Sequence, residues 1–223
     1  MNIISMSLWG DKHLYTHGAI ENANLVDSVF PGWTLRIYHD NTVPTEILRK
    51  LSTLGCDLVE REPTVDALGM FWRFEPAFDT GVGRFIVRDA DSRINKRDFD
   101  AVMEWVESDK CFHIIRDCES HNVPILGGTW GAKSGSIPGF RHMMRYWLQT
   151  KIKIDYKNPR GMYHGQDQMF LWNMVWPLIE SPDLHCAHIR ASDDMPPGSN
   201  LRFTGHEIEL PPLDGGVYIG QVC

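Results

Sequence analysis

The sequence predicts an α/β protein: a single domain with a mostly parallel central sheet and helices packed against it. Two observations lead to this prediction. Strand-like and helix-like hydrophobic patterns alternate from the first residues onward, as they do when helices connect neighbouring parallel strands. The chain has 223 residues, of which 43% are hydrophobic and 23% are charged, and this size and composition are typical of one globular domain. We therefore expect one domain over residues 1–223.

The first half of the sequence contains four strand-like runs. Hydrophobic patterns predict strands at residues 3–6, 35–38, 58–59 and 84–88 and helices at 16–29 and 44–54. Pro44 and Gly55 occupy the positions that these residue types favour at the start and just past the end of a helix. An aromatic-rich segment at 70–78 is also expected to be helical, with a break at Pro76.

The second half continues the alternation to about residue 176. The expected elements are a helix at 97–107, a strand at 112–115, a Gly-rich stretch at 127–132, helices at 138–148 and 166–176, and a strand-like piece at 184–189. Asn95 is expected to cap the first of these helices, and Asp98 favours its positive N-terminal end. Pro177 is expected to end the last helix. Residues 181–216 are rich in Pro, Gly, Asp and Ser and predict mostly loops.

Composition and charge exclude several classes of protein. The net charge of −7 argues against a general nucleic-acid coat. No apolar run approaches the roughly 18 residues that cross a bilayer, and residues 1–10 lack the basic segment of a secretory signal. We therefore expect a cytoplasmic protein without a transmembrane segment. Five cysteines without a CxxC pair are typical of reduced thiols. Cys186 with His185 and His188 is the best candidate for a zinc site, although ordinary packing is favoured.

Two carboxylates directly after the strand at 84–88 point to chemistry. Asp89 and Asp91 are separated by the small Ala90. In an open α/β sheet, ligands bind at the carboxyl ends of the strands, and residues two apart in an extended segment face the same side. Two carboxylates on one side repel each other, and a hard divalent cation such as Mg²⁺ or Mn²⁺ relieves that repulsion. An acidic turn that caps the following segment is the alternative.

The run FIVRDADS at 85–92 resembles the DxD strand end of glycosyltransferases of the GT-A fold, and the order of the other features is similar to the glycogenin-like and bacterial galactosyltransferase-like members. Those enzymes open with a strand–helix–strand unit, here within 3–40. The DxD follows, then a Gly-containing strand that resembles 127–132, then an acidic pair at the start of a helix, here GQDQ at 165–168. The resemblance extends to about residue 176.

The resemblance implies a metal-dependent enzyme that moves a sugar from a nucleotide-diphosphate sugar to a hydroxyl acceptor on a glycan, a lipid or a protein. Mn²⁺ or Mg²⁺ would be the cofactor. Asp91 would bind the metal, and Asp89 would bind the metal or the ribose. A histidine from the C-terminal part would complete the metal site, with His185 favoured over His188 and His206. Residues 1–95 would form the nucleotide-sugar-binding half and 96–223 the acceptor-side half.

Further site residues follow from the same resemblance. Asp167 would be the second functional carboxylate: it would hold donor-sugar hydroxyls in a retaining enzyme or act as general base in an inverting one. A capping role at a helix N-terminus is its structural alternative. The donor would be bound by Ser7, Leu8 and Asp40 at base and ribose, Arg73 and Arg88 at the diphosphate, with Arg93 as a further candidate, and Gly128 beside the sugar.

Two more features have both a functional and a structural interpretation. Residues 141–160 contain six basic residues and one acidic residue. They form either a solvated helix face and loop or a site for an anionic acceptor, nucleic acid being the least favoured. The chain contains 11% aromatic residues. Most are expected in the core, and Trp130 is the candidate for stacking on a sugar.

Three other functions compete with glycosyl transfer. A haloacid-dehalogenase-like phosphatase normally has its DxD near the N-terminus with Thr or Val four residues after the first Asp, where this sequence has Arg93. A nucleotidyltransferase on a related sheet would use the same carboxylates and metal but would release pyrophosphate. A non-catalytic carbohydrate-binding protein would keep its ligand affinity after the Asp91→Ala substitution.

Overall fold

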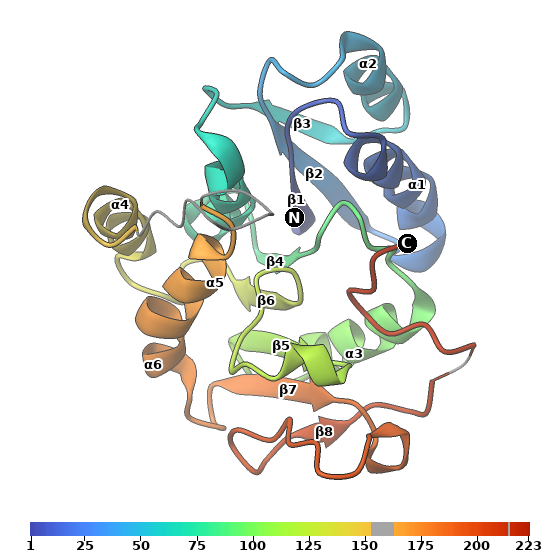
Figure 1. Cartoon of the computed structure of the whole chain (residues 1–223), viewed down its shortest axis with the longest axis vertical. Coiled ribbons are helices and arrows are strands. Elements are labelled where there is room, and N and C mark those ends of the chain that lie inside the picture. The colour runs from blue at the N-terminus through green and yellow to red at the C-terminus, as the bar shows by residue number, and fades with distance from the viewer. Residues whose placement is uncertain (153–162, 214) are drawn as a thin grey trace.

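The computed structural model describes residues 1–152, 163–213 and 215–223. Within these residues the strands form one eight-stranded sheet in the order β3-β2-β1-β4-β6-β5-β7-β8 (Figure 1). The strands are β1 Asn2–Leu8, β2 Trp33–His39, β3 Asp57–Glu60, β4 Arg84–Val87, β5 Phe112–Arg116, β6 Trp130–Lys133, β7 His185–Ile189 and β8 Ile208–Glu209. β6 runs antiparallel to β4 and β5, and the other neighbouring pairs are parallel. The predicted fold class is therefore confirmed.

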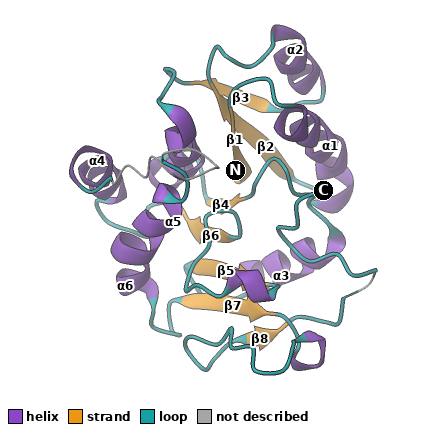
Figure 2. Cartoon of the chain, viewed as in Figure 1, coloured by secondary structure: helices purple, strands orange, loops and turns teal. Residues whose placement is uncertain are grey.

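Helices cover both faces of this sheet (Figure 2). They are α1 His13–Val29, α2 Thr45–Thr53, α3 Lys96–Glu107, α4 Phe140–Thr150, α5 Gln166–Phe170 and α6 Trp176–Ile179, with 3₁₀ segments η1 Asp66–Phe78, η2 Glu119–His121 and η4 Ser192–Asp194 and the π-helical turn η3 Leu171–Val175. One apolar cluster packs the sheet against η1, α4 and α5, with Phe74 and Phe170 inside it. The other packs the sheet against α1 and α3, with Ile20 and Trp105 inside it.

The first half of the sheet forms where the sequence predicts it. Four parallel strands, β1 to β4, come from the four predicted runs, and α1 and α2 from the two predicted helices. The Asn95 side chain caps α3 by accepting a hydrogen bond from the backbone N–H of Asp98 at 2.9 Å. One sheet crosses the predicted division at residue 95, because β4 pairs with β6.

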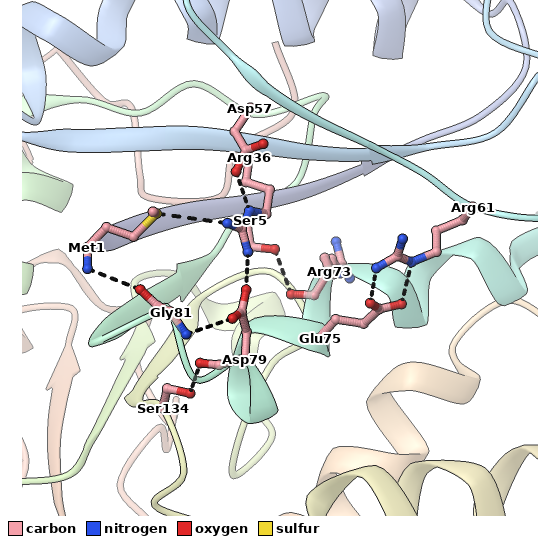
Figure 3. A network of polar contacts seen from close by, with 10 residues as sticks. All are labelled: Met1, Ser5, Arg36, Asp57, Arg61, Arg73, Glu75, Asp79, Gly81 and Ser134. Carbon is pink, nitrogen blue, oxygen red and sulfur yellow. Dashed lines mark hydrogen bonds and ion pairs between the residues drawn. The ribbon is translucent and has the colours of Figure 1, made fainter.

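The prediction of a break at Pro76 is wrong, because η1 continues through it to Phe78. A 3₁₀ helix bonds each N–H to the carbonyl three residues earlier, and proline has no N–H. The carbonyl left without its donor is that of Arg73, and the Ser5 hydroxyl of β1 donates to it instead at 2.8 Å (Figure 3). A strand side chain thus replaces the missing hydrogen bond.

The prediction that Pro177 ends its helix is also wrong. The chain passes from α5 through η3 into α6, and Pro177 is in the first turn of α6. Proline is tolerated there because the first N–H groups of a helix have no partner inside it. Among the described residues, no helix combines the length and apolarity that crossing a bilayer requires.

Candidate active site

The two carboxylates of the DxD lie in a tight turn at the carboxyl end of β4. Ser92 closes this turn, with its N–H and hydroxyl donating to the Asp89 carbonyl at 3.4 and 3.1 Å. Asn22 of α1 anchors the turn, because its side chain donates to the Ser92 carbonyl at 2.8 Å and accepts from the Ile94 N–H at 3.0 Å. Gly18 makes this approach possible, since a Cβ there would lie 2.0 Å from the Ala90 carbonyl oxygen.

Arg73 joins two carboxylates that are far apart in the sequence. One of its terminal nitrogens donates to Asp89, and the other donates to Asp167 at 2.7 Å. Arg73 and Asp167 are both buried, at 5% and 4% exposure. Burial alone would lower the pKa of Arg73, but the two carboxylates outweigh it and raise that pKa above its ordinary value. Three predicted site residues therefore meet in one ion-pair network, in which Arg73 and Asp167 are buried and the Asp89 side chain is 39% exposed.

The sequence positions Arg73 through β1 and η1. Its backbone carbonyl accepts from Ser5, and its N–H donates to the Ser7 hydroxyl at 3.0 Å. Figure 3 shows Ser5 and Arg73 next to a second network on the same face, in which Arg36 bonds to Asp57 and Asp79. Ser7, predicted at the base or ribose, thus positions Arg73, and a contact of its own with the donor stays a prediction.

Two glycines allow these segments to converge. A Cβ on Gly128 would lie 1.9 Å from Asp89 Oδ2. A Cβ on Gly127 would lie 2.7 Å from Asp167 Oδ2 and 2.9 Å from an Arg73 nitrogen. The Gly127 N–H also donates to the Gln168 side chain at 2.8 Å. Gly128 therefore gives the Asp89 carboxylate its space, and its predicted position beside the donor sugar stays a prediction.

The Asp89–Asp91 pair has the chemistry of a divalent-cation site. Burial and the charge of Asp89 both raise the pKa of Asp91, which is the repulsion that a cation would relieve. Among the described residues, no group of three or more His, Cys, Asp or Glu side chains is arranged to hold a metal. Two carboxylates fit Mg²⁺ or Mn²⁺, which leave their other positions to water and substrate phosphates.

The structure does not bring Arg88 to this site. Arg88 is 2% exposed, and its guanidinium is paired with Asp98 of α3 through hydrogen bonds of 2.9 and 2.5 Å. The prediction that Arg88 contacts the diphosphate is therefore wrong. Arg93, the third flanking arginine, pairs with Glu21 of α1. These two ion pairs hold α3 and α1 against the segment that contains β4 and the DxD turn.

His185 lies away from the carboxylates. It begins β7 and pairs with Phe112, the first residue of β5. Phe112 aligns through β6 with Phe85 near the start of β4, whereas Asp91 follows the end of β4. The described residues thus place His185 at the amino ends of the strands. Its ring is 4% exposed and bonds to the Ile179 carbonyl at 2.7 Å.

The other histidine candidates also lie outside the DxD turn. His188 bonds to Glu104 of α3 at 3.0 Å, and His206 is exposed. Cys186 bonds to Ser108, which follows α3, while His185 packs against Trp176 on the opposite face of the sheet. Alternation along β7 thus separates His185 from Cys186 and His188, which both face α3, so the three side chains of the predicted zinc candidate do not converge.

Three more predicted residues have clear places. Leu8 is 1% exposed and packs in the core, so only its backbone faces the carboxyl edge. Asp40 follows β2 and accepts from the Thr42 N–H at 3.0 Å, which closes the loop there. Trp130 is 0% exposed and packs against Phe74 and Phe85, so the prediction that it stacks on a sugar is wrong.

The predicted basic run lies partly outside the described residues, which omit 153–162. Its first part is on α4, where Arg141 and Arg145 are exposed. The Arg141 guanidinium lies 4.5 Å from the centre of the Phe78 ring. An anionic acceptor at this face stays a prediction.

Residues 217–223 adjoin the DxD turn, which the sequence did not indicate. The Cys223 N–H donates to the Asp91 carbonyl at 2.9 Å, and Val222 forms an antiparallel bridge with Ser92. The Ile219 N–H donates at 2.9 Å to Asp117, which follows β5. These contacts lie in loops without hydrophobic periodicity, so no sequence signal predicts them.

Known structures share this fold. A glycosyltransferase involved in glycosylation of the major capsid of PBCV-1 is similar with a TM-score of 0.50 and 10% identity, over 84% of this chain and 81% of that chain. The 4-diphosphocytidyl-2C-methyl-D-erythritol synthase of Anaerococcus prevotii has a TM-score of 0.50 and 9% identity, over 91% and 90%. An active-site mutant of LgtC has a TM-score of 0.49 and 10% identity, over 77% and 70%.

No family model matches the sequence, and no curated protein is similar to it. At identities near 10% the structural likeness establishes the fold. The resemblance to the GT-A fold is confirmed at that level.

Proposed function

We propose that the protein is a glycosyltransferase that uses a nucleotide-diphosphate sugar and Mn²⁺ or Mg²⁺. The observation that supports this most is the position of Asp89 and Asp91. They directly follow β4, a central strand of a GT-A-like sheet, at the edge where such sheets bind ligands, and Arg73 connects Asp89 to Asp167. The acceptor would be a hydroxyl group of a glycan, a lipid or a protein.

Each residue of the network has a separate task in this proposal. Asp89 and Asp91 would hold the metal, which would neutralise the negative charge that grows on the departing nucleoside diphosphate. Arg73 fixes one carboxylate oxygen of Asp89 and one of Asp167. Gly127 and Gly128 keep side chains out of the space beside them. The site is thus oriented before any ligand binds, which lowers the entropic cost of binding.

Asp167 would bind the hydroxyls of the donor sugar. Arg73 occupies its Oδ2, and no described residue donates a hydrogen bond to its Oδ1. A carboxylate with one fixed and one open oxygen accepts a hydroxyl proton in a hydrogen bond of defined direction. This role favours the retaining alternative over a general base for the acceptor.

A donor screen by thermal shift tests the function. UDP-, GDP-, CMP- and dTDP-sugars would each be added with and without Mn²⁺. A donor at a hundredfold excess over its Kd stabilises the folded chain by about 2.7 kcal/mol. We expect one donor to raise the melting temperature only when Mn²⁺ is present. If every donor with Mn²⁺ left the melting temperature unchanged, the proposal would be wrong.

Nucleotidyl transfer is the second candidate, and one observation favours it. The erythritol synthase covers 91% of this chain at the same TM-score as the capsid glycosyltransferase, and its product carries a diphosphocytidyl group. The products separate the two reactions. A glycosyltransferase releases a nucleoside diphosphate, whereas a nucleotidyltransferase that consumes a nucleoside triphosphate releases pyrophosphate. Pyrophosphate release with CTP, UTP, GTP or dTTP would therefore support the second candidate.

A further inference from the structure

The arginines predicted near the DxD are already paired with carboxylates. Arg73 bonds to Asp89 and Asp167, Arg88 to Asp98, and Arg93 to Glu21. A nucleoside diphosphate brings further negative charge to an edge that already has two aspartates. Arginine and other N–H donors are the groups that bind phosphate oxygens best. At the same edge of the sheet, two such donors have no anionic partner among the described residues.

Arg190 has the required properties. It follows the carboxyl end of β7, and its backbone N–H donates to the Arg116 carbonyl at 3.0 Å. Its side chain forms no ion pair with a described carboxylate, and its Nε is buried without a hydrogen-bond partner. It also borders a cavity of about 300 Å³ formed with residues 195–202. Arg190 is half-buried, and no described carboxylate compensates its charge.

His121 is the second donor. It ends η2 and is 9% exposed. Its Nδ1 accepts the Asp117 N–H at 3.3 Å, so a neutral imidazole carries its proton on Nε2. No described group is hydrogen-bonded to that Nε2. Nε2 is thus able to donate to a ligand.

Contacts place His121 beside the DxD. The Asp89 carboxylate lies against Gly128, and the next residue, Thr129, lies 3.0 Å from where a Cβ on Gly220 would be. That same Cβ position is 3.4 Å from the His121 ring. Arg190 lies next to His121, because its N–H donates to the Arg116 carbonyl while the N–H of the following Asp117 donates to His121 Nδ1. His121 is therefore close to the segment that packs on Asp89, and Arg190 is close to His121.

Residues 218–223 connect these groups. Tyr218 packs edge-on against the His121 ring with 5.6 Å between the ring centres, and the Cys223 N–H holds the Asp91 carbonyl. Between them, the Ile219 N–H donates to the Asp117 carboxylate, and the Arg97 guanidinium donates to the same carboxylate at 2.9 and 2.6 Å. The segment thus forms a fixed rim from His121 to Asp91.

We propose that Arg190 and His121 bind the diphosphate of the nucleotide donor, with residues 218–223 as the rim that holds His121 in place. This inference rests on the proposed function. Arg190 would pair with phosphate oxygens through its planar fork, and His121 would donate one hydrogen bond from Nε2.

Calorimetry with nucleoside diphosphates tests the assignment. UDP, GDP, CDP and dTDP would be titrated with Mn²⁺ into the wild-type chain, and the tightest binder and its nucleoside would then be used with the variants. The Arg190→Met variant should bind the diphosphate about tenfold more weakly, which corresponds to about 1.4 kcal/mol. Its affinities for the nucleoside and for Mn²⁺ should be unchanged. Arg190→Lys should recover part of the loss.

His121 gives a second, smaller effect. His121→Phe should weaken diphosphate binding several-fold, and His121→Gln, which keeps an N–H donor, should bind nearly as the wild type does. The control is Arg49→Met, which removes an exposed arginine of α2 and should leave every affinity unchanged. If a variant failed to fold, the Arg190 Nε–H and His121 ring signals in NMR spectra of the wild type should shift when the diphosphate is added with Mg²⁺.

Two outcomes would overturn the proposal by different routes. A wild-type chain that binds a diphosphate while Arg190→Met binds it equally well, or loses nucleoside affinity to the same extent, refutes the assignment and leaves the proposed function intact. A wild-type chain that binds none of the four diphosphates with Mn²⁺ refutes both.

Discussion

The N-terminal part of the sheet, with strands β1 to β4, and the C-terminal part, with strands β5 to β8, are held together by different interactions. In the N-terminal part, the seven-residue strands β1 and β2 pair along their whole length, and apolar side chains such as Ile4 and Ile37 pack below the helices. In the C-terminal part, β8 has two residues, and buried polar side chains hold the surrounding loops. Glu207, for example, accepts the N–H groups of Phe203 and Thr204 at 2.5 and 2.7 Å.

This difference determines how each part responds to substitution. Apolar packing is spread over many contacts, so the loss of one polar side chain at its surface costs little. A buried polar contact is local, and removal of one partner leaves the other buried without compensation. The C-terminal part should therefore be the sensitive one, although the proposed metal ligands follow β4 of the N-terminal part.

The largest expected effect is on Asp117, whose side chain is fully buried and paired with Arg97. Asp117→Ala leaves this arginine without its counter-charge and the Ile219 N–H without its acceptor, and breaking a buried pair costs about 3–5 kcal/mol. The matched substitution in the N-terminal part is Asp57→Ala, whose carboxylate is 37% exposed and bonds to Arg36; it should cost less than about 1 kcal/mol. Urea unfolding measures both. Equal losses would contradict the comparison.

The second-largest effect should come from acid, which should destabilise the C-terminal part. Burial lowers the pKa values of four histidines, and they are His113, His121, His185 and His188. The pKa of His121 falls from 6.5 to about 4, which corresponds to roughly 3 kcal/mol. The native state keeps these rings neutral while the unfolded chain binds protons, so this stability is present above pH 6.5 and lost as pH falls toward 4.

The unfolding free energy measured between pH 7 and 4 checks this expectation. His121→Gln should flatten the dependence, because glutamine does not titrate. Hydrogen exchange should locate the early loss of protection in β5 and β7 rather than in β1 and β2. A curve with the same slope in the variant would remove His121 as the cause.

Asp91→Asn should weaken ligand binding without lowering the free energy of unfolding, whereas Asp117→Ala should lower the free energy of unfolding. The substitution removes a carboxylate whose pKa burial and Asp89 raise, so folding should not suffer. Binding of Mn²⁺ with the nucleotide donor should fall about a hundredfold, which corresponds to roughly 2.8 kcal/mol. Calorimetry and urea unfolding on the same sample separate the two effects. A variant that unfolds easily but still binds donor would show that Asp91 has a structural task.

Gly128→Ala should have the smallest of these effects. Its Cβ would lie 1.9 Å from Asp89 Oδ2, so the carboxylate must turn away from its present position. We expect about a tenfold loss of Mn²⁺-dependent donor affinity, or about 1.4 kcal/mol. The control is Gly83→Ala, where the nearest atom is 3.5 Å away. Donor affinity equal to that of the control would show that Asp89 is not held by this glycine.

The sequence predicts the part of the site that regular elements carry. The apolar run before Asp89 and Asp91 identifies both the strand and its end, and Arg73 and Asp167 lie in segments with clear helical patterns. Arg88 misled the prediction because a cation beside a DxD looks the same whether it binds phosphate or Asp98, which is ten residues further along. Only the direction in which the Arg88 side chain points decides between these two partners.

Other features have no pattern that could have located them. His185 begins a predicted strand, but hydrophobic patterns do not say which end of that strand adjoins the DxD. Asp117 follows β5, His121 ends the three-residue segment η2, and Arg190 follows β7, all without any motif. Their positions depend on hydrogen bonds between residues about a hundred positions apart, such as that between Asp117 and Ile219.

The hydrogen bond between Cys223 and Asp91 has a consequence for synthesis on the ribosome. β1, β2 and β4 emerge early and can pair while the rest of the chain is still being made, since parallel strands and α1 supply most of their contacts. The turn that carries the aspartates must wait for residues 218–223. A nascent chain would thus acquire these paired strands well before it completes the turn that carries Asp89 and Asp91, and the proposed ligands would find their site only after residues 218–223 have emerged.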